Sequence, residues 1–249
     1  SATKHYFGQK FAKNYDIKFV NKNNEFEYVY QTSWGSSTRM MGALIMSHSD
    51  DRGLVLPPKI APKQVVIIPI KDDEELISIA EKINESLLLK RISSYIDYSD
   101  KSAGFKFAEA EVNGVPVRVE IGKRDLENDS VTLVRRDTLE KIVVPFEEIL
   151  PKVKELLATI QSDMFKRAKA RRDSMIYDAK TYDELREIAT TKDGGFIKIN
   201  WCGNESCENK IKDDFGIKSR CLIDDEEVTG PCTVCGEKAT IRLYIGRQY

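Results

Sequence analysis

The spacing of the cysteines is the feature that most constrains how this chain can fold. Four residues separate Cys202 from Cys207, two separate Cys232 from Cys235, and 24 residues lie between the two pairs. Two close pairs, each on its own turn, can supply four thiolates to one zinc ion in tetrahedral geometry at about 2.3 Å. Because four thiolates complete the coordination shell, the pattern predicts a structural rather than a catalytic zinc site.

The same cysteines allow an alternative, in which they are free thiols or form disulfides. The chain has five cysteines, an odd number, and all of them lie in its last fifth. That distribution suits a reduced compartment and a metal site better than a disulfide framework. Gly203 and Gly236 each follow a cysteine, where the backbone must turn tightly. Cys221 has no close partner, and we expect it to be a buried apolar residue rather than a fifth ligand.

Length and composition indicate a folded chain with more than one domain. It has 249 residues, of which 41% are hydrophobic and 32% charged, as in ordinary globular proteins. No run approaches the roughly 18 apolar residues that cross a membrane, so we expect a soluble, cytoplasmic protein with no membrane partner. The formal net charge is −1, and nucleic-acid binding must therefore rest on local patches. The chain begins at Ser1 with motifs already dense, which suggests a fragment.

Residues 1–59 predict a strand, a turn and a helix. Apolar side chains alternate over residues 25–34, which is the period of a half-buried strand. Met40, Met41, Leu44 and Ile45 then recur at helical spacing, after a serine or threonine that can cap the helix. Two prolines at residues 57–58 cannot continue a helix. We therefore expect a domain boundary near residue 60.

Residues 60–180 predict a mixed sheet with helices packed on it. The apolar run at residues 65–68 is typical of a strand buried on both faces, and an apolar helical stripe follows over residues 76–87. Residues 115–121 alternate as a strand, and a long amphipathic helix is expected over residues 145–177. The predicted order β-α-β-α-β-β-β-α favours an α/β (α+β) fold.

Residues 181–249 form a third predicted domain around the cysteines. Strands are expected at residues 196–201 and 240–245, and the domain is expected to be a small α+β unit that binds zinc. The sequence thus predicts three domains, at residues 1–59, 60–180 and 181–249.

Several motifs together resemble prolyl-tRNA synthetases of the eukaryotic and archaeal-like branch, and the resemblance covers essentially the whole chain. The block at residues 31–39 is similar to motif 3 of class II synthetases, which makes residues 1–59 similar to the C-terminal part of their catalytic domain. The motifs are TKHYFGQ at residues 3–9, QTSWGSSTR at 31–39, MSHSDDRGLVLPP at 46–58, APKQVV at 61–66, GVPVR at 114–118, RD at 124–125, VRRDT at 134–138 and GRQY at 246–249.

The resemblance implies a site for ATP and L-proline in the first domain. Arg39 would be catalytic and would contact ATP, and a fixed guanidinium suits a triphosphate. The implied substrate-binding residues are Thr3, His5, Gln31, Thr32, Trp34, Gly35, Ser37 and Arg39. The residues alone also allow a plain helix cap with a solvated Arg39, and structural roles for His5 and His48.

The resemblance also implies an anticodon-binding domain at residues 60–180. Arginine forks can bond guanine acceptors, and carboxylates can accept from guanine amino groups. The implied base-reading residues are Glu111, Arg118, Arg124, Asp125, Arg135 and Arg136. A basic run over residues 166–172 suits phosphates, although such a run is usually a solvated helix face.

The activity implied by the family is activation of proline with ATP and Mg²⁺, followed by transfer of the prolyl group to proline tRNA. A homodimer through the catalytic domain is also implied. Motifs 1 and 2 of class II synthetases are absent from this sequence, so we expect the chain alone to be inactive. A tRNA-binding accessory protein and a zinc-ribbon interaction module are the rival readings. The first has no need of residues 34–39, and the second accounts only for the cysteines.

The sequence departs from the family pattern at four positions, which bear on pocket and anticodon details. Lys4 stands where serine is common, and Ser49 where glycine is common. Ala110 replaces a frequent tryptophan, and Lys123 a frequent proline.

Overall fold

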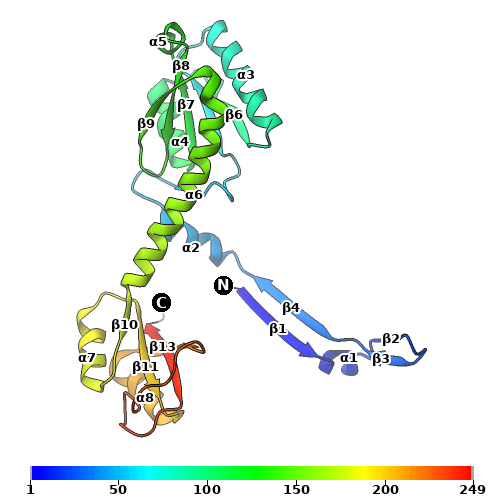
Figure 1. Ribbon diagram of the computed structural model, residues 1–249, viewed down its shortest axis with the longest axis vertical. Helices are drawn as coiled ribbons and strands as arrows, with labels where there is room; N and C mark the ends of the chain where they lie inside the picture. Colours follow the sequence, from blue (N-terminus) through cyan, green and yellow to red (C-terminus); the bar gives the residue numbers. More distant parts are fainter. Residues whose placement is uncertain (1, 248–249) are drawn as a thin grey trace. The chain divides into compact units, whose positions relative to one another are not determined.

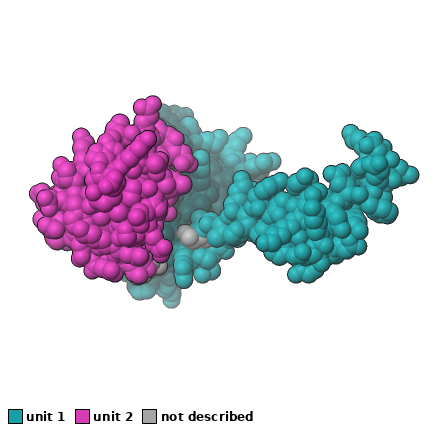
Figure 2. All heavy atoms as spheres, turned by 90° about the horizontal axis from the view of Figure 1, so that it is seen from below, with its two compact units in different colours: residues 1–164 teal, residues 165–249 magenta. Residues whose placement is uncertain are grey.

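The computed structural model describes residues 2–247 and divides into two compact units, residues 1–164 and 165–249 (Figure 1, Figure 2). The division falls inside helix α6 (Ile149–Ser174). The three predicted domains, with boundaries at 59/60 and 180/181, stay a prediction. Gln248 and Tyr249 of the GRQY motif lie outside the described residues. Within residues 2–247, no helix combines the length and apolar character needed to cross a bilayer.

Residues 2–48 form two antiparallel ribbons and two helices. β1 pairs with β4, and β2 pairs with β3. The single strand predicted over residues 25–34 is therefore wrong, because the chain leaves one ribbon after Tyr28 and enters the other at Gln31. The elements are β1 (Ala2–Gly8), α1 (Lys10–Asn14), β2 (Lys18–Val20), β3 (Phe26–Tyr28), β4 (Gln31–Ser36) and α2 (Arg39–His48).

Helix α2 forms where the apolar spacing predicts it, but its cap and its packing differ from the prediction. Thr38 has helical backbone angles and makes no side-chain cap hydrogen bond. No residue of α2 is buried, and Met40, Met41 and Ile45 are exposed. Helical spacing identifies an apolar face but does not say what covers it.

A five-stranded mixed sheet occupies residues 65–145 of the first unit, in the strand order β6-β5-β7-β8-β9. β5 is parallel to β6 and β7, whereas β8 is antiparallel to β7 and β9. This confirms the predicted mixed sheet. The elements are β5 (Val65–Pro69), α3 (Glu74–Leu89), β6 (Ser94–Ile96), α4 (Ala103–Val112), β7 (Val117–Ile121), α5 (Lys123–Glu127), β8 (Ser130–Arg135), β9 (Lys141–Pro145), η1 (Phe146–Glu148) and α6.

Helices cover both faces of this sheet. The apolar faces of α3 and α6 pack on Val65, Ile67 and the same-face residues of β7. Ala110 of α4 packs on Val66 and Ile68 from the other side. Both faces of β5 are therefore buried, which explains its continuous apolar run. Asp73 caps α3 by accepting from the backbone N–H of Glu75, as an N-cap aspartate should.

After the last turns of α6, the second unit forms a four-stranded sheet with the helices α7 and α8, within the residues described up to Arg247. The strand order is β10-β11-β13-β12, with β10 parallel to β11 and the other pairs antiparallel. The strands predicted at residues 196–201 and 240–245 are confirmed as β11 and β13. The elements are β10 (Ile176–Asp178), α7 (Tyr182–Thr191), β11 (Phe196–Trp201), α8 (Glu205–Phe215), β12 (Ile217–Leu222) and β13 (Ile241–Arg247).

Candidate functional site

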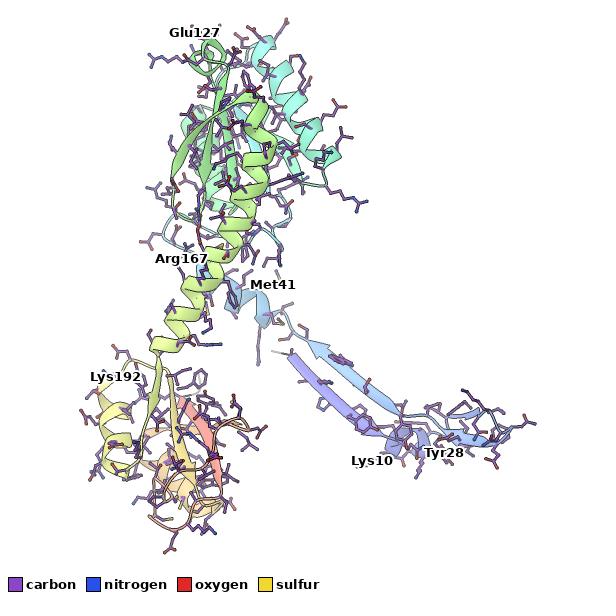
Figure 3. All side chains as sticks on the ribbon, viewed as in Figure 1. Lys10, Tyr28, Met41, Glu127, Arg167 and Lys192 are labelled. Carbon is purple, nitrogen blue, oxygen red and sulfur yellow. The ribbon has the colours of Figure 1, made fainter. Side chains whose placement is uncertain are left out.

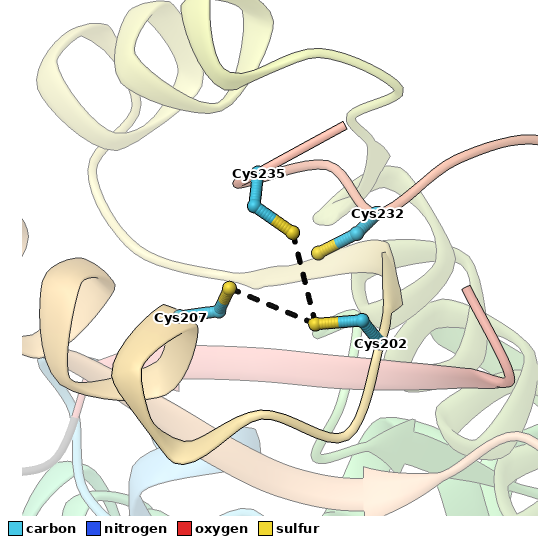
Figure 4. A group of neighbouring side chains, drawn as sticks. All are labelled: Cys202, Cys207, Cys232 and Cys235. Atoms are coloured by element: carbon cyan, nitrogen blue, oxygen red, sulfur yellow. Dashed lines mark hydrogen bonds between the residues drawn. The ribbon is translucent and has the colours of Figure 1, made fainter. Parts of the chain in front are cut away.

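The four predicted metal ligands converge in the second unit (Figure 4). Cys202 directly follows β11, and Cys207 lies in the first turns of α8. Cys232 and Cys235 come from a tight turn in which the N–H of Gly236 donates to the carbonyl of Cys232 at 2.9 Å. All four sulfur atoms lie within 4.8 Å of one another.

The sulfur separations fit a tetrahedral metal site. Cys202 Sγ lies 3.7 Å from Cys207 Sγ and 3.8 Å from Cys235 Sγ. A tetrahedron with metal–sulfur bonds of about 2.3 Å has edges of about 3.8 Å, whereas a disulfide requires about 2.05 Å. All five cysteines are free, so the cluster is of the kind that can hold a metal ion.

The surroundings of the thiols differ within the cluster. Burial works against ionisation of Cys232, but hydrogen bonds from the backbone groups of Cys235, Val234 and Cys202 outweigh it and lower the pKa of Cys232 to about 7. Burial, together with the neighbouring thiols, raises the pKa of Cys207 to about 12. Four adjacent thiolates repel one another, so a bound cation is what would allow all four to ionise.

Cys221 differs from the prediction. It is exposed on β12 rather than buried. β12 is an edge strand, and five of its six residues are exposed. Cys221 is not part of the four-cysteine cluster found within the described residues, and its predicted exclusion from metal binding stays a prediction.

The predicted substrate residues lie on two faces of the β1–β4 ribbon. His5 lies opposite Ser33 and Thr3 opposite Gly35, and opposite residues of a pair share one face. Trp34, opposite Lys4, and Thr32, opposite Tyr6, lie on the other face. The ribbon thus brings Thr3, His5 and Gly35 together but separates them from Trp34.

Gly35 allows a close approach within this ribbon. A Cβ atom at residue 35 would lie 3.0 Å from Thr3 Oγ1, closer than a normal van der Waals contact. The side-chain oxygen Oε1 of Gln31 is buried without a hydrogen-bond partner, a polar group that a ligand could satisfy. Ser37 and Arg39 are exposed at the start of α2. Trp34 is 71% exposed.

Three of the predicted anticodon-binding arginines are buried in ion pairs. Arg118 donates to Glu120 at 2.9 Å and to Glu111 at 3.1 Å, and its guanidinium lies 4.5 Å from the centre of the Phe107 ring. Arg135 bonds both Asp137 oxygens at 3.0 Å and Asp163 at 2.9 Å. These contacts give both arginines a structural role that sequence reasoning missed. Their predicted role in base reading stays a prediction.

The third buried arginine, Arg136, pairs with a residue from outside the sheet. Its two terminal nitrogens donate to both oxygens of Asp50, at 2.8 and 2.6 Å. Burial works against ionisation of Asp50, but the bonds from Arg136 are the larger effect and lower its pKa to about 2. Both residues lie in motifs noted in the sequence, at 46–58 and 134–138, but nothing in the sequence indicated that the two residues pair.

Arg124 and Asp125 lie on the short helix α5, where Arg124 is exposed. Asp125 accepts from the backbone N–H of Gly122 at 2.8 Å and so closes the start of the helix. Among the predicted base-reading arginines, Arg124 is the one whose guanidinium the described structure leaves exposed. Glu111 is partly buried between Arg118 and Arg52.

The structure shows the surroundings of the four residues that depart from the family pattern. Lys4 Nζ lies 4.8 Å from the centre of the Trp34 ring, a cation–π contact. Ser49 has extended backbone angles that do not require glycine. Ala110 is buried in the core. Lys123 pairs with Asp73 at 2.8 Å and so joins α5 to the start of α3.

The basic run lies on the last turns of α6, where residues 165–167 and 169–174 are exposed (Figure 3). Lys169 and Arg172 both pair with Asp173. These pairs neutralise part of the run, which is what a solvated helix face commonly shows.

Comparison with known proteins places this arrangement in a family. The family described as "Anticodon binding domain" matches residues 64–156, and "Prolyl-tRNA synthetase, C-terminal" matches residues 182–249. The proline–tRNA ligase of Clostridium novyi (strain NT) is 48% identical over the whole chain. The chain belongs to the prolyl-tRNA synthetase family. A proline–tRNA ligase of Lachnospira eligens is 45% identical, again over the whole chain.

A solved prolyl-tRNA synthetase shows the same fold. The enzyme of Cryptosporidium parvum, complexed with L-proline and AMP, matches 100% of this chain and 54% of its own, with a TM-score of 0.86 and 36% identity. The chain spans about half the length of the curated relatives it matches, 52% for both bacterial ligases. The match to the prolyl-tRNA synthetase family confirms the resemblance found in the sequence, together with the anticodon-binding domain.

Proposed function

We propose that the protein containing this chain is a proline–tRNA ligase, which activates proline with ATP and transfers the prolyl group to proline tRNA. The observation that carries the proposal is identity of 45–48% to proline–tRNA ligases along the entire chain. A shared anticodon-binding region alone would not extend to residues 31–39. The continuous match therefore favours a synthetase over a tRNA-binding accessory protein or a zinc-ribbon module.

The proposed substrate site is built on the β1–β4 ribbon and the start of α2. Arg39 would hold the triphosphate of ATP, with Mg²⁺ offsetting further charge, so that proline's carboxylate can attack the α-phosphate. Thr3, His5 and Gly35 share one face of the ribbon and would contribute one side of the pocket. The related Cryptosporidium enzyme is a complex with L-proline and AMP, which supports the same substrate classes here.

The ribbon needs a further covering, and this supports a larger catalytic domain. An isolated two-stranded sheet is marginally stable in water, yet Tyr6, Tyr30 and Trp34 are all more than 60% exposed. We propose that the remainder of a class II catalytic domain packs against these side chains. A homodimer through that domain belongs to the same proposal, and the mass of the native protein tests it.

We further propose that the four-cysteine cluster holds one structural zinc ion. Four thiolates with tetrahedral spacing are the donor set that selects zinc. The ion would fix the turn after β11 to the turn that carries Cys232 and Cys235. The free thiols fit the cytoplasmic location expected from the sequence, which stays a prediction.

The proposed tRNA contact lies on the anticodon-binding region, with Arg124 as the exposed base-reading arginine. Glu111, Asp125 and the buried arginines would act around it, and the basic run of α6 would contact phosphates. The lysines and arginines would make this binding depend on salt concentration.

Amino-acid-dependent exchange of pyrophosphate into ATP tests the proposed activity. The full-length protein containing this chain should catalyse exchange with proline and not with the other amino acids. Specific tRNA binding without any proline-dependent exchange would instead support the accessory-protein reading.

A further inference from the structure

The turn at residues 50–54 is seated on the anticodon-binding region, two residues after α2 ends. The backbone N–H of Asp50 donates to the carbonyl of Gly53, and the N–H of Gly53 donates to the carbonyl of Asp50, both at 3.1 Å. The N–H of Arg52 donates to Asp50 Oδ1 at 2.9 Å. The N–H of Leu54 donates to the carbonyl of Val112, at the end of α4. The turn thus has a fixed local shape and a backbone bond to its neighbour.

Two glycines allow the backbone of the turn to approach the backbone at the end of α4 closely. A Cβ at Gly53 would lie 2.5 Å from Val112 Cα, and a Cβ at Gly114 would lie 2.7 Å from Leu54 Cβ. Both glycines also have positive φ, at 135° and 69°, which other residues rarely adopt. The two backbones can therefore approach only because neither position carries a side chain.

Asp50 neutralises a guanidinium that is itself buried. The Arg136 side chain is only 2% exposed, and it donates to Asp50 from both terminal nitrogens. Its Nε donates to the carbonyl of Glu111 at 2.9 Å. Removing Asp50 would leave a buried charge without its counter-charge, which is strongly unfavourable.

A second ion pair extends from the same turn into the sheet. Arg52 lies 3.1 Å from Glu111 Oε2, and the other oxygen of Glu111 lies 3.1 Å from Arg118. Arg118 in turn pairs with Glu120 on β7. Alternating charges therefore link the turn to two residues, Glu111 and Arg118, that the sequence predicts to read the anticodon.

From these contacts we propose that Asp50 and Arg52 are positioning residues for the transfer step, anchoring the end of the Arg39-bearing helix to the anticodon-binding region. The inference rests on the proposed function. Activation involves only ATP and proline, so it does not need this anchor. Transfer needs one tRNA to be held at its anticodon while its terminal ribose reacts, and a loose tether lowers the effective concentration of that ribose.

Three measurements on the full-length protein test the inference. They are proline-dependent pyrophosphate exchange, the Kd for proline tRNA, and the single-turnover rate of prolyl transfer at saturating tRNA. We expect Asp50→Asn and Arg52→Gln to slow transfer by about tenfold, with exchange and Kd at wild-type values. Asp51→Asn is the matched control, because Asp51 is an exposed neighbouring carboxylate, and it should leave all three unchanged.

Three outcomes overturn the inference. Transfer at the wild-type rate in both variants would show that the anchor has no role. A parallel loss of exchange would place the residues in support of the active site, and a weaker Kd that accounts for the whole loss would place them in tRNA binding. Arg52→Gln keeps the test valid if Asp50→Asn folds poorly, because the Arg52 side chain is 60% exposed. A wild-type protein that fails to activate proline would refute the proposed function itself.

Discussion

At the scale of single residues, the five cysteines show that residues of the same type have different environments according to their place in the fold. Cys202, Cys207, Cys232 and Cys235 share one site, whereas Cys221 stands exposed on an edge strand. Spacing in the sequence was enough to separate the two groups, because ligand pairs must sit on short turns. The spacing did not reveal that Cys221 is exposed, since its exposure depends on which strand lies at the edge of the sheet.

The metal content of single variants checks this division. Cys232→Ser removes one of four thiolates and should reduce zinc from one ion per chain to a substoichiometric level, with loss of stability in the second unit. Cys221→Ser is the matched control and should retain the ion. Elemental analysis after gel filtration gives both values, and loss of zinc from Cys221→Ser alone would contradict the assignment.

Arg39 carries the chemical prediction at residue scale. Arg39→Ala should lower the rate of proline-dependent pyrophosphate exchange by about 100-fold or more, as expected when a group that stabilises transition-state charge is lost. Arg39→Lys should recover little, because a compact ammonium cannot replace a planar fork. Lys13→Ala, an exposed cation on α1, is the control. Near-normal exchange by Arg39→Ala would remove Arg39 from the site.

Arg124 distinguishes base reading from structural support. Its exposed guanidinium can reach a base, so Arg124→Ala should weaken binding of proline tRNA by about 1–3 kcal/mol and leave the thermal unfolding temperature unchanged. Glu127→Ala on the same helix serves as the control. Filter binding with proline tRNA and an unrelated tRNA measures the effect, and equal losses for both would argue against base reading.

At the scale of elements, the sheet of residues 65–145 could be predicted from the sequence because its strands follow one another in the chain and carry continuous apolar patterns. β7 shows the limit of that reasoning. Its alternation of Val117, Arg118, Val119 and Glu120 predicts a half-buried strand, yet every residue is buried. The two polar residues, Arg118 and Glu120, form an ion pair beneath α4. Hydrophobic periodicity alone cannot predict that two charged residues will be buried together as a pair.

Residues 2–48 show a different limit. The ribbon β1–β4 joins residues 2–8 to residues 31–36, and the distance between them in the sequence conceals the pairing. The faces therefore could not be assigned in advance, and the predicted substrate residues were treated as a single set. The anchor at Asp50 was also hidden, because its partner Arg136 lies 86 positions away.

The anchor turn has a pH dependence that can be measured. The bonds from Arg136 lower the pKa of Asp50 from 3.8 to about 2. A carboxylate with a lowered folded-state pKa stabilises the fold fully above its unfolded pKa and loses that effect as pH falls through the folded value. Asp50→Asn should therefore be less stable than wild type above about pH 5, with the difference shrinking toward pH 2. Urea unfolding across this range measures it, and a difference independent of pH would contradict the ion pair.

At the scale of the whole molecule, three kinds of site occur along one chain: a candidate ATP and proline segment, an anticodon-binding region and a metal cluster. Each is recognisable from local residues. The proline–tRNA ligases of Clostridium novyi and Lachnospira eligens align with the entire chain, and therefore with all three segments. A tRNA ligase needs both a catalytic segment and an anticodon-binding region, because prolyl transfer and anticodon recognition take place at different ends of the same tRNA.

Transfer of labelled proline to tRNA by the full-length protein tests the central proposal most directly. With ATP and Mg²⁺ present, the account predicts that radiolabel becomes bound through an ester to the terminal ribose of proline tRNA alone, and that omission of ATP abolishes it. Purified tRNAs for other amino acids are the control. Charging of another tRNA in preference to proline tRNA, or no charging by a folded, zinc-loaded protein, would contradict it.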